Sequence, residues 1–269
     1  MRLLYHIVCL AVIVITFSSC EKVIDLDLNS AEKKYVVEAT MSDQSESVRV
    51  LISQTKDFDE DSNFPGISGA TVTITERGGN SYTLTDGGTG LYYHGSLRAE
   101  PGKTYDLRVQ LAGEVFTASS TAPQPVAIDS LYITDELLFG DYRKMANLRF
   151  RDPPGRGNCY RFVQYVNGIR ETQIMIMNDD YIDDRLVTST LYYFADEDDG
   201  DILIKPGDEV KVKFQVIDEP VYKYWFSLLR SSTGGNQQAS PANPVSNMQG
   251  GALGYFSAHT ETVATVIVP

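Results

Sequence analysis

Cys20 is the residue whose position most clearly indicates chemistry. It follows the small pair Ser18 and Ser19, which end an apolar segment from Leu3 to Phe17. A short apolar segment with a basic residue before it and small residues at its end is typical of an export signal. A cysteine at the cut site predicts acylation of its thiol, and two or three acyl chains anchor a protein where one binds only marginally. We therefore expect residues 1–19 to be a lipoprotein signal peptide and Cys20 to be the lipid attachment site.

Two other interpretations of the amino-terminal segment are weaker. A transmembrane helix needs about 18 or more consecutive apolar residues, whereas this run stops at Ser18 and is followed by Glu21 and Lys22. An ordinary secretory signal is the second alternative, and the cysteine at the cut site argues against it. We expect residues 20–33 to be a tether between the lipid and the folded chain.

Catalytic residue types are scarce after this cysteine. His6 lies in the signal, which leaves His94 and His259, and the chain contains no HExxH, GxxxxGK[ST] or GxSxG motif. Histidine is the usual general base near neutral pH. Of the three cysteines, only Cys159 lies outside the signal and the anchor, and the strand-like alternation around it predicts a buried thiol. We therefore expect that the protein is not an enzyme and carries no cofactor.

Two acidic clusters are the best candidates for a site outside the anchor. They lie at Asn178–Asp184 and at Asp196–Asp201, and calcium binds such oxygen ligands. Aligning Gly200 with the glycine of an EF-hand loop puts Ala195 at the first ligand position and Pro206 at the position of the bidentate glutamate, so that motif fails. We expect solvated, mutually repelling turns and no metal, with a calcium site as the alternative.

The charge of the chain excludes one class of partner. The formal net charge is −13 and no stretch concentrates lysine or arginine, whereas a nucleic-acid-binding protein shows a basic patch. Tyrosine pairs such as Tyr92-Tyr93 and Tyr192-Tyr193 could form platforms for a partner. Because neighbouring residues on a strand face opposite sides, we expect one ring of each pair in the core.

The rest of the chain predicts a mainly β fold. Residues 34–123 contain short alternating segments separated by glycine turns, which favours an immunoglobulin-like or prealbumin-like β-sandwich. Residues 124–269 predict a second antiparallel β domain, with Asn167-Gly168 as a hairpin turn. The closing segments Leu253–Ala258 and Thr262–Val268 are predicted as two strands.

One helix is expected within the second domain, near residues 219–231. Val221, Tyr224, Trp225 and Leu228 recur at spacings of three and four residues, and Asp218 or Glu219 can cap the first turn. We expect the Trp225 face of this helix to pack on the second sheet. The polar residues 231–251 that follow predict a long loop.

Several short motifs together resemble a known family. They run in order over nearly the whole chain after the signal: Ser19–Leu26, Gly69–Ile74, Pro101–Tyr105, Phe150–Gly155, Pro206–Val210, Tyr222–Trp225, Asn243-Pro244 and Gly250–Ala258. The chain resembles the Bacteroidota lipoproteins of domain-of-unknown-function family 4249. The resemblance implies a cell-envelope lipoprotein often encoded beside TonB-dependent outer-membrane receptors, with no established catalytic residues, so that only Cys20 carries over as a functional position.

These observations predict an outer-membrane lipoprotein that acts as a non-catalytic binding or assembly accessory of a TonB-dependent nutrient-uptake system, on either face of that membrane. Loops such as 178–184 and 231–251 would contact the ligand or receptor. One alternative is a hydrolase of glycans or peptides with two facing carboxylates, which glycosidases hold roughly 5–9.5 Å apart. The other is a purely structural envelope protein.

Overall fold

Sixteen strands and one helix make up the described part of the chain. The computed structural model describes residues 32–44, 48–57, 63–138, 140–193, 203–232 and 243–269. Residues 33–56 and 61–269 form one compact unit. The predicted signal peptide, Cys20 and nearly all of the predicted tether lie outside the described residues, as do the acidic cluster 196–201 and residues 233–242 of the predicted loop.

The first half of the chain forms two facing sheets around one core. One face comes from strands of a nine-stranded sheet: β1 (Tyr35–Ser42), β2 (Val48–Gln54), β5 (Thr85–Asp86) and β6 (Leu91–His94). The opposing sheet contains β4 (Ser81–Thr83), β3 (Thr71–Glu76), β7 (Thr104–Leu111) and β8 (Glu114–Thr121). Val37, Ala39 and Met41 of β1 are fully buried in this core, whereas the intervening Glu38 is exposed. This alternation is the period of two that the sequence predicts.

The second half forms another pair of sheets. A three-stranded sheet of β14 (Leu186–Leu191), β10 (Asp141–Arg151) and β9 (Ile128–Leu138) shares a core with β11 (Cys159–Val166) and β15 (Glu209–Ile217). The short strands β12 (Ile169–Arg170) and β13 (Met175–Asn178) both pair with β11. Phe214 lies at the centre of this core, with ring centroids 4.7 Å from Phe150, 5.2 Å from Phe162 and 5.3 Å from Tyr160.

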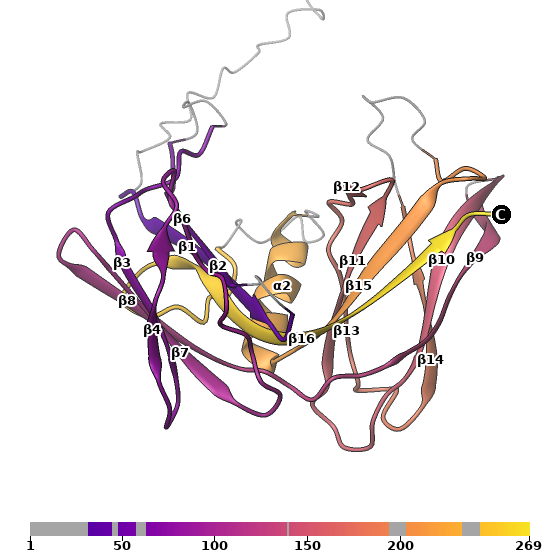
Figure 1. The fold of residues 1–269 in the computed structure, drawn as a ribbon. Helices are drawn as coiled ribbons and strands as arrows, with labels where there is room; N and C mark the ends of the chain where they lie inside the picture. Colours follow the sequence, from indigo (N-terminus) through magenta and orange to yellow (C-terminus); the bar gives the residue numbers. More distant parts are fainter. Residues whose placement is uncertain (1–31, 45–47, 58–62, 139, 194–202, 233–242) are drawn as a thin grey trace, which may run out of the picture. The chain divides into compact units, whose positions relative to one another are not determined.

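The last strand joins the two halves. The sequence predicts two closing strands, but the structure has one continuous strand, β16 (Leu253–Ile267), and this prediction was wrong. Its first part pairs in parallel with β1 and its second part pairs antiparallel with β15. Figure 1 shows β16, in yellow, crossing from one group of strands to the other. The polar run His259-Thr260-Glu261 looks like a break in the sequence, yet all three residues are buried within the strand.

The continuity of β16 makes a single nine-stranded sheet in the order β12-β11-β15-β16-β1-β2-β6-β5, with β13 beside β11. Gly254 permits the close parallel pairing at the start of β16. Its φ is +96°, and a Cβ there would lie 2.1 Å from the carbonyl oxygen of Val37. The mainly β fold with antiparallel sheets is confirmed. The predicted division into residues 34–123 and 124–269 separates two segments of the sequence, whereas β16 pairs with strands of both segments.

The helix α2 (Glu219–Ser232) begins and ends close to the predicted limits. Asp218 caps it, since its Oδ1 accepts a hydrogen bond from the backbone N–H of Val221 at 3.3 Å. Its Oδ2 accepts from the Ser120 hydroxyl at 2.8 Å and from the Thr121 N–H at 2.9 Å, so the cap also ties the helix to β8. The Trp225 face packs against Cys159, Ile217 and Tyr255. The helix therefore covers part of the nine-stranded sheet on the side away from both cores.

Candidate ligand-binding groove

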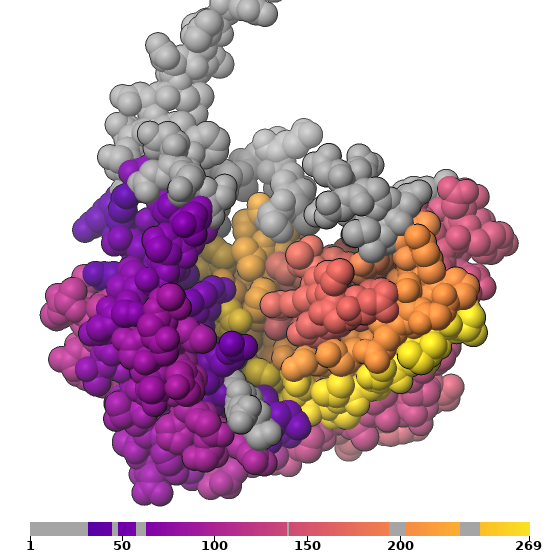
Figure 2. Space-filling view, turned by 45° about the horizontal axis from the view of Figure 1, so that its top comes forward, coloured from indigo at the N-terminus to yellow at the C-terminus, as the bar shows by residue number. Residues whose placement is uncertain are grey.

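A polar groove lies on the nine-stranded sheet where the two halves of the chain meet. Its volume is about 350 Å³. Figure 2 shows this surface hollowed between the indigo strands of the first half and the coral and orange strands of the second. The lining residues come from β1, β2, β11, β12, β15 and β16 and the turn after β1: Thr40, Ser42, Gln44, Arg49, Arg161, Val163, Tyr165, Arg170, Lys213, Gln215, Tyr255, His259 and Glu261.

Strand register places these side chains on one face. Arg161 of β11 pairs with Gln215 of β15, and Gln215 pairs with Glu261 of β16, so the three residues form a row across the sheet. Tyr165 pairs with Arg170 in the β11–β12 hairpin. This hairpin turns at Asn167-Gly168, where both residues have positive φ as the predicted two-residue turn requires.

Arg161 is the most constrained cation of the groove. Its guanidinium carbon lies 3.8 Å from the ring centroid of Trp225, and its Nη1 donates a hydrogen bond to Gln215 Oε1 at 3.1 Å. Burial lowers the pKa of Arg161 to about 10, and the nearby charge of Arg170 acts in the same direction. The side chain is still charged at neutral pH and is held in one orientation.

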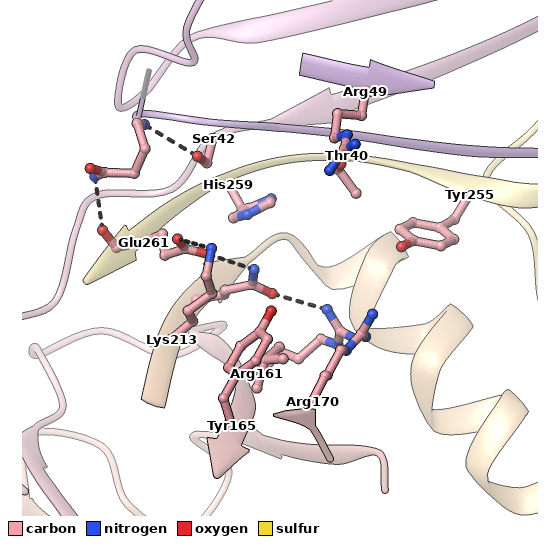
Figure 3. Close-up of a pocket in the computed structure, with 13 residues that line it drawn as sticks. Thr40, Ser42, Arg49, Arg161, Tyr165, Arg170, Lys213, Tyr255, His259 and Glu261 are labelled. Atoms are coloured by element: carbon pink, nitrogen blue, oxygen red, sulfur yellow. Dashed lines mark hydrogen bonds and ion pairs between the residues drawn. The ribbon is translucent and has the colours of Figure 1, made fainter. Parts of the chain in front are cut away.

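Arg49 and Arg170 approach the groove from its two sides, as Figure 3 shows. Arg49 stands on β2 opposite Thr40, and both arginines are exposed. Within the described ranges, neither of them nor Arg161 forms an ion pair with a carboxylate. The groove therefore holds three guanidinium groups that form no ion pair with a carboxylate of the described ranges, although the charge of Glu261 acts on Arg161.

Among the described residues, Glu261 is the only carboxylate that lines the groove, and its charge is already compensated. Lys213 Nζ lies 3.0 Å from Glu261 Oε1, and Gln215 Nε2 donates to Oε2 at 2.9 Å. The Glu261 side chain is only 6% exposed. Its charge is thus used to hold Lys213 and Gln215 in place.

His259 lies beside this pair and is electrically neutral. Burial lowers its pKa to about 4, while the charge of Glu261 opposes that shift. Ser257, His259 and Glu261 alternate along β16 and are the residue types of a hydrolase triad. The Ser257 hydroxyl contacts Nδ1 of His259 at 3.1 Å, which is the nitrogen that the acid occupies in such a triad. Because Ser257 and His259 are also buried, this arrangement does not present an activated nucleophile.

Two tyrosines complete the walls of the groove. Lys211 Nζ lies 4.7 Å from the ring centroid of Tyr165, and the Tyr255 ring contacts Trp225 with 5.1 Å between centroids. Burial raises the pKa of the Tyr255 hydroxyl, so it stays protonated. These rings offer flat apolar surfaces next to hydrogen-bonding groups, an arrangement common in ligand sites.

The predicted acidic site at 178–184 is organised differently. Asp179 is buried, and its Oδ2 accepts a hydrogen bond from the Asn158 N–H at 2.9 Å. Asp183 accepts from the Gly155 N–H at 2.8 Å, and Asp184 lies 3.6 Å from Arg151. Among the described residues, no three His, Cys, Asp or Glu side chains are grouped closely enough to hold a metal ion. The carboxylates of this loop bind the protein's own backbone and side chains.

The other candidate positions divide between core and surface. Cys159 is buried as predicted, and burial raises the pKa of its thiol to about 12. In the two tyrosine pairs, Tyr92 and Tyr193 are buried, whereas Tyr93 and Tyr192 are 46% and 44% exposed. The alternation expected for each pair is therefore confirmed.

The fold and the groove define a mainly β protein with a polar cavity lined by arginine. Residues 21–265 match the family described as "Domain of unknown function (DUF4249)", and the chain belongs to this family. No curated protein matches the sequence. Across the described ranges, none of the helices combines the length and the apolar character needed to span a membrane.

Sequence reasoning missed the groove because its charges are far apart along the chain. Arg49, Arg161 and Arg170 belong to strands that become neighbours only through β16 and the β11–β12 turn. The alternation of Arg161, Val163 and Tyr165 was the available signal. It places one cation and one aromatic ring on a strand face opposite the core.

Proposed function

We propose that this protein is a lipid-anchored, non-catalytic binding protein that serves as an accessory of a TonB-dependent uptake system in the outer membrane. Cys20 would carry the lipid, and the groove would bind a solute that the uptake system takes in. The amino-terminal motif and the family resemblance support the anchor and the receptor association. The observation that carries the binding role is the groove itself, with three arginines that form no ion pair with a carboxylate of the described ranges.

The chemistry of the lining residues supports binding over catalysis. His259 is neutral and buried, Glu261 is engaged by Lys213 and Gln215, and the carboxylates of the 178–184 loop bind the protein itself. A glycosidase needs two carboxyl groups facing one cleft, and the described part of the chain contributes one to this groove. The hydrolase interpretation therefore has less support.

Lipid attachment at Cys20 and association with a receptor are tested together in cells. The full chain carrying an affinity tag at its carboxyl end is purified from detergent-solubilised membranes, beside a Cys20→Ala variant. We expect incorporation of a palmitate analogue into the parent chain alone, and stoichiometric recovery of a TonB-dependent receptor with it. Equal labelling of both chains, or recovery of the parent without a receptor, contradicts the proposal.

A further inference from the structure

We propose that the groove binds a small solute that carries at least two oxyanion groups, either carboxylates or phosphates, and that Arg49, Arg161 and Arg170 bind them. This inference rests on the proposed binding function and adds the chemical class of the ligand. Its first support is a contrast of charge. The chain has a net charge of −13, yet the described residues that line the groove include four arginine or lysine side chains and one carboxylate.

The second support is the state of Arg161. A cation removed from water costs free energy unless an opposite charge or hydrogen bonds compensate for it. Arg161 has a neutral partner, Gln215, and an aromatic ring, Trp225, and these leave part of its fork of N–H donors free. The stacking holds the planar group in place before the ligand arrives, which reduces the entropy lost on binding. A guanidinium in a fixed plane matches the paired oxygens of a carboxylate or phosphate.

The third support is the arrangement of the other two arginines. Arg170 is close enough to Arg161 to affect its ionisation, and Arg49 faces them from β2 across the groove (Figure 3). Like charges that converge repel one another, and the Glu261 carboxylate is already hydrogen-bonded to Lys213 and Gln215, so a bound anion reduces this repulsion. Because the cations come from both sides, a solute with two or more charged groups satisfies them better than one with a single charge.

The fourth support is size. A volume of about 350 Å³ lies at the lower end of the range for small-molecule sites, about 300–1,000 Å³. Thr40 and Gln44 add polar groups, and Tyr165 and Tyr255 flank the cations with apolar ring surface. The groove therefore suits a compact polyanion with some carbon skeleton.

The test is calorimetric titration of the full chain, purified in detergent, with two probes. Citrate represents the carboxylates and pyrophosphate the phosphates, while triethyl citrate is the uncharged match of citrate. We expect citrate, pyrophosphate or both to bind, with an affinity that falls as salt rises, and we expect no binding of triethyl citrate. Which anion binds more tightly identifies the oxyanion source.

The variants locate the binding. The Arg49→Gln/Arg170→Gln double variant changes two exposed side chains, and we expect it to weaken binding at least tenfold without altering thermal unfolding. The control is Arg108→Gln, an exposed arginine of β7 outside the groove, which should bind like the parent. Arg161→Lys keeps the charge but loses the planar fork, and it should also bind more weakly.

Three results would overturn the inference. These are the absence of binding by both anions, equal binding of triethyl citrate, and unchanged affinity in the double variant. Such a failure is distinguishable from failure of the proposed function, because receptor recovery and lipid labelling are measured separately and do not depend on these probes.

Discussion

The acidic loop at 178–184 and the cationic groove differ in how their charges are satisfied. In the loop, Asp179 and Asp183 accept backbone N–H groups at 2.9 and 2.8 Å, so the carboxylates serve the fold. In the groove, the guanidinium groups of Arg49 and Arg170 make no hydrogen bond within the described part of the chain. Charge density in the sequence pointed to the loop. Unused hydrogen-bonding capacity, which only the structure reveals, indicates the groove.

The loop and the groove also differ in how they offset the free-energy cost of removing a polar or charged side chain from water. A buried carboxyl group is stable when hydrogen bonds replace water, and Asp179 accepts one from the Asn158 N–H. Arg161 is only partly compensated, by Gln215, Trp225 and the charge of Glu261, with which it forms no ion pair in the described part of the chain. A bound anion can therefore supply further hydrogen bonds and an opposite charge to Arg161, whereas Asp179 already has its partner within the protein.

The largest effect on stability is expected from removing the buried hydrogen bond that Asp179 accepts in the 178–184 loop. Asp179→Ala leaves the Asn158 N–H without its acceptor, and we expect a loss of about 2–3 kcal/mol in the free energy of unfolding, measured with urea. Asp180→Ala is the matched control, because Asp180 is exposed and, within the described ranges, its side chain accepts a hydrogen bond from the Asn178 side chain alone. Anion binding should be unchanged in both variants. Equal stability of the two would contradict a structural role for Asp179.

The next effect concerns pH and the groove. The pKa of His259 is about 4 in the folded protein against 6.5 unfolded, so the unfolded chain binds more protons between these values. The free energy of unfolding that the neutral His259 contributes is therefore fully present above pH 6.5 and is lost as pH falls towards 4. We expect about 2 kcal/mol less stability at pH 5 than at pH 7 from this residue alone.

Urea unfolding of the parent and of a His259→Gln variant at both pH values measures this contribution. The variant should lose stability less steeply as pH falls, and His94→Gln, which keeps His259, should behave like the parent. Bound citrate should reduce the acid sensitivity, since an anion near His259, Arg161 and Glu261 favours the imidazolium. An identical slope in the parent and the His259→Gln variant would refute the assignment.

A smaller effect is expected on the affinity of the groove for anions when the charge of Glu261 is removed. Glu261→Gln removes the one carboxylate that the described residues contribute to the groove and frees Lys213, which is 35% exposed and can be hydrated. We expect citrate to bind roughly 3–10 times more tightly, equivalent to about 1 kcal/mol. Glu209→Gln, at the far end of β15, is the control. Weaker binding by the Glu261 variant would mean that its carboxylate orients the site rather than opposing the anion.

The smallest effect is expected at the exposed ion pair of the loop. Arg151 and Asp184 are both 64% exposed, and their closest charged atoms are 3.6 Å apart. Arg151→Gln should change the free energy of unfolding by less than about 0.5 kcal/mol, because water and salt screen such pairs. A loss as large as that of Asp179→Ala in the same urea titration would show that ion pairing, rather than buried hydrogen bonds, holds the loop.

Local patterns determined most of the secondary structure of this protein. Strands such as Glu209–Ile217 and the helix with its Asp218 cap follow from alternation, spacing and capping, because these signals act between neighbouring residues. The burial of Cys159 and of one ring in each tyrosine pair followed from the same alternation. Membership of the family also rests on the sequence, through residues 21–265.

Only the tertiary structure decided that β16 is one strand shared by both halves of the chain, and where the charges meet. His259, Thr260 and Glu261 look like a polar break until β1 and β15 bury them on either side. Arg49 and Arg161 are more than one hundred positions apart in the sequence, and their approach depends on strand pairing at long range. Sequence patterns report what each residue prefers locally, whereas a binding groove depends on which distant residues the fold brings together and leaves without partners.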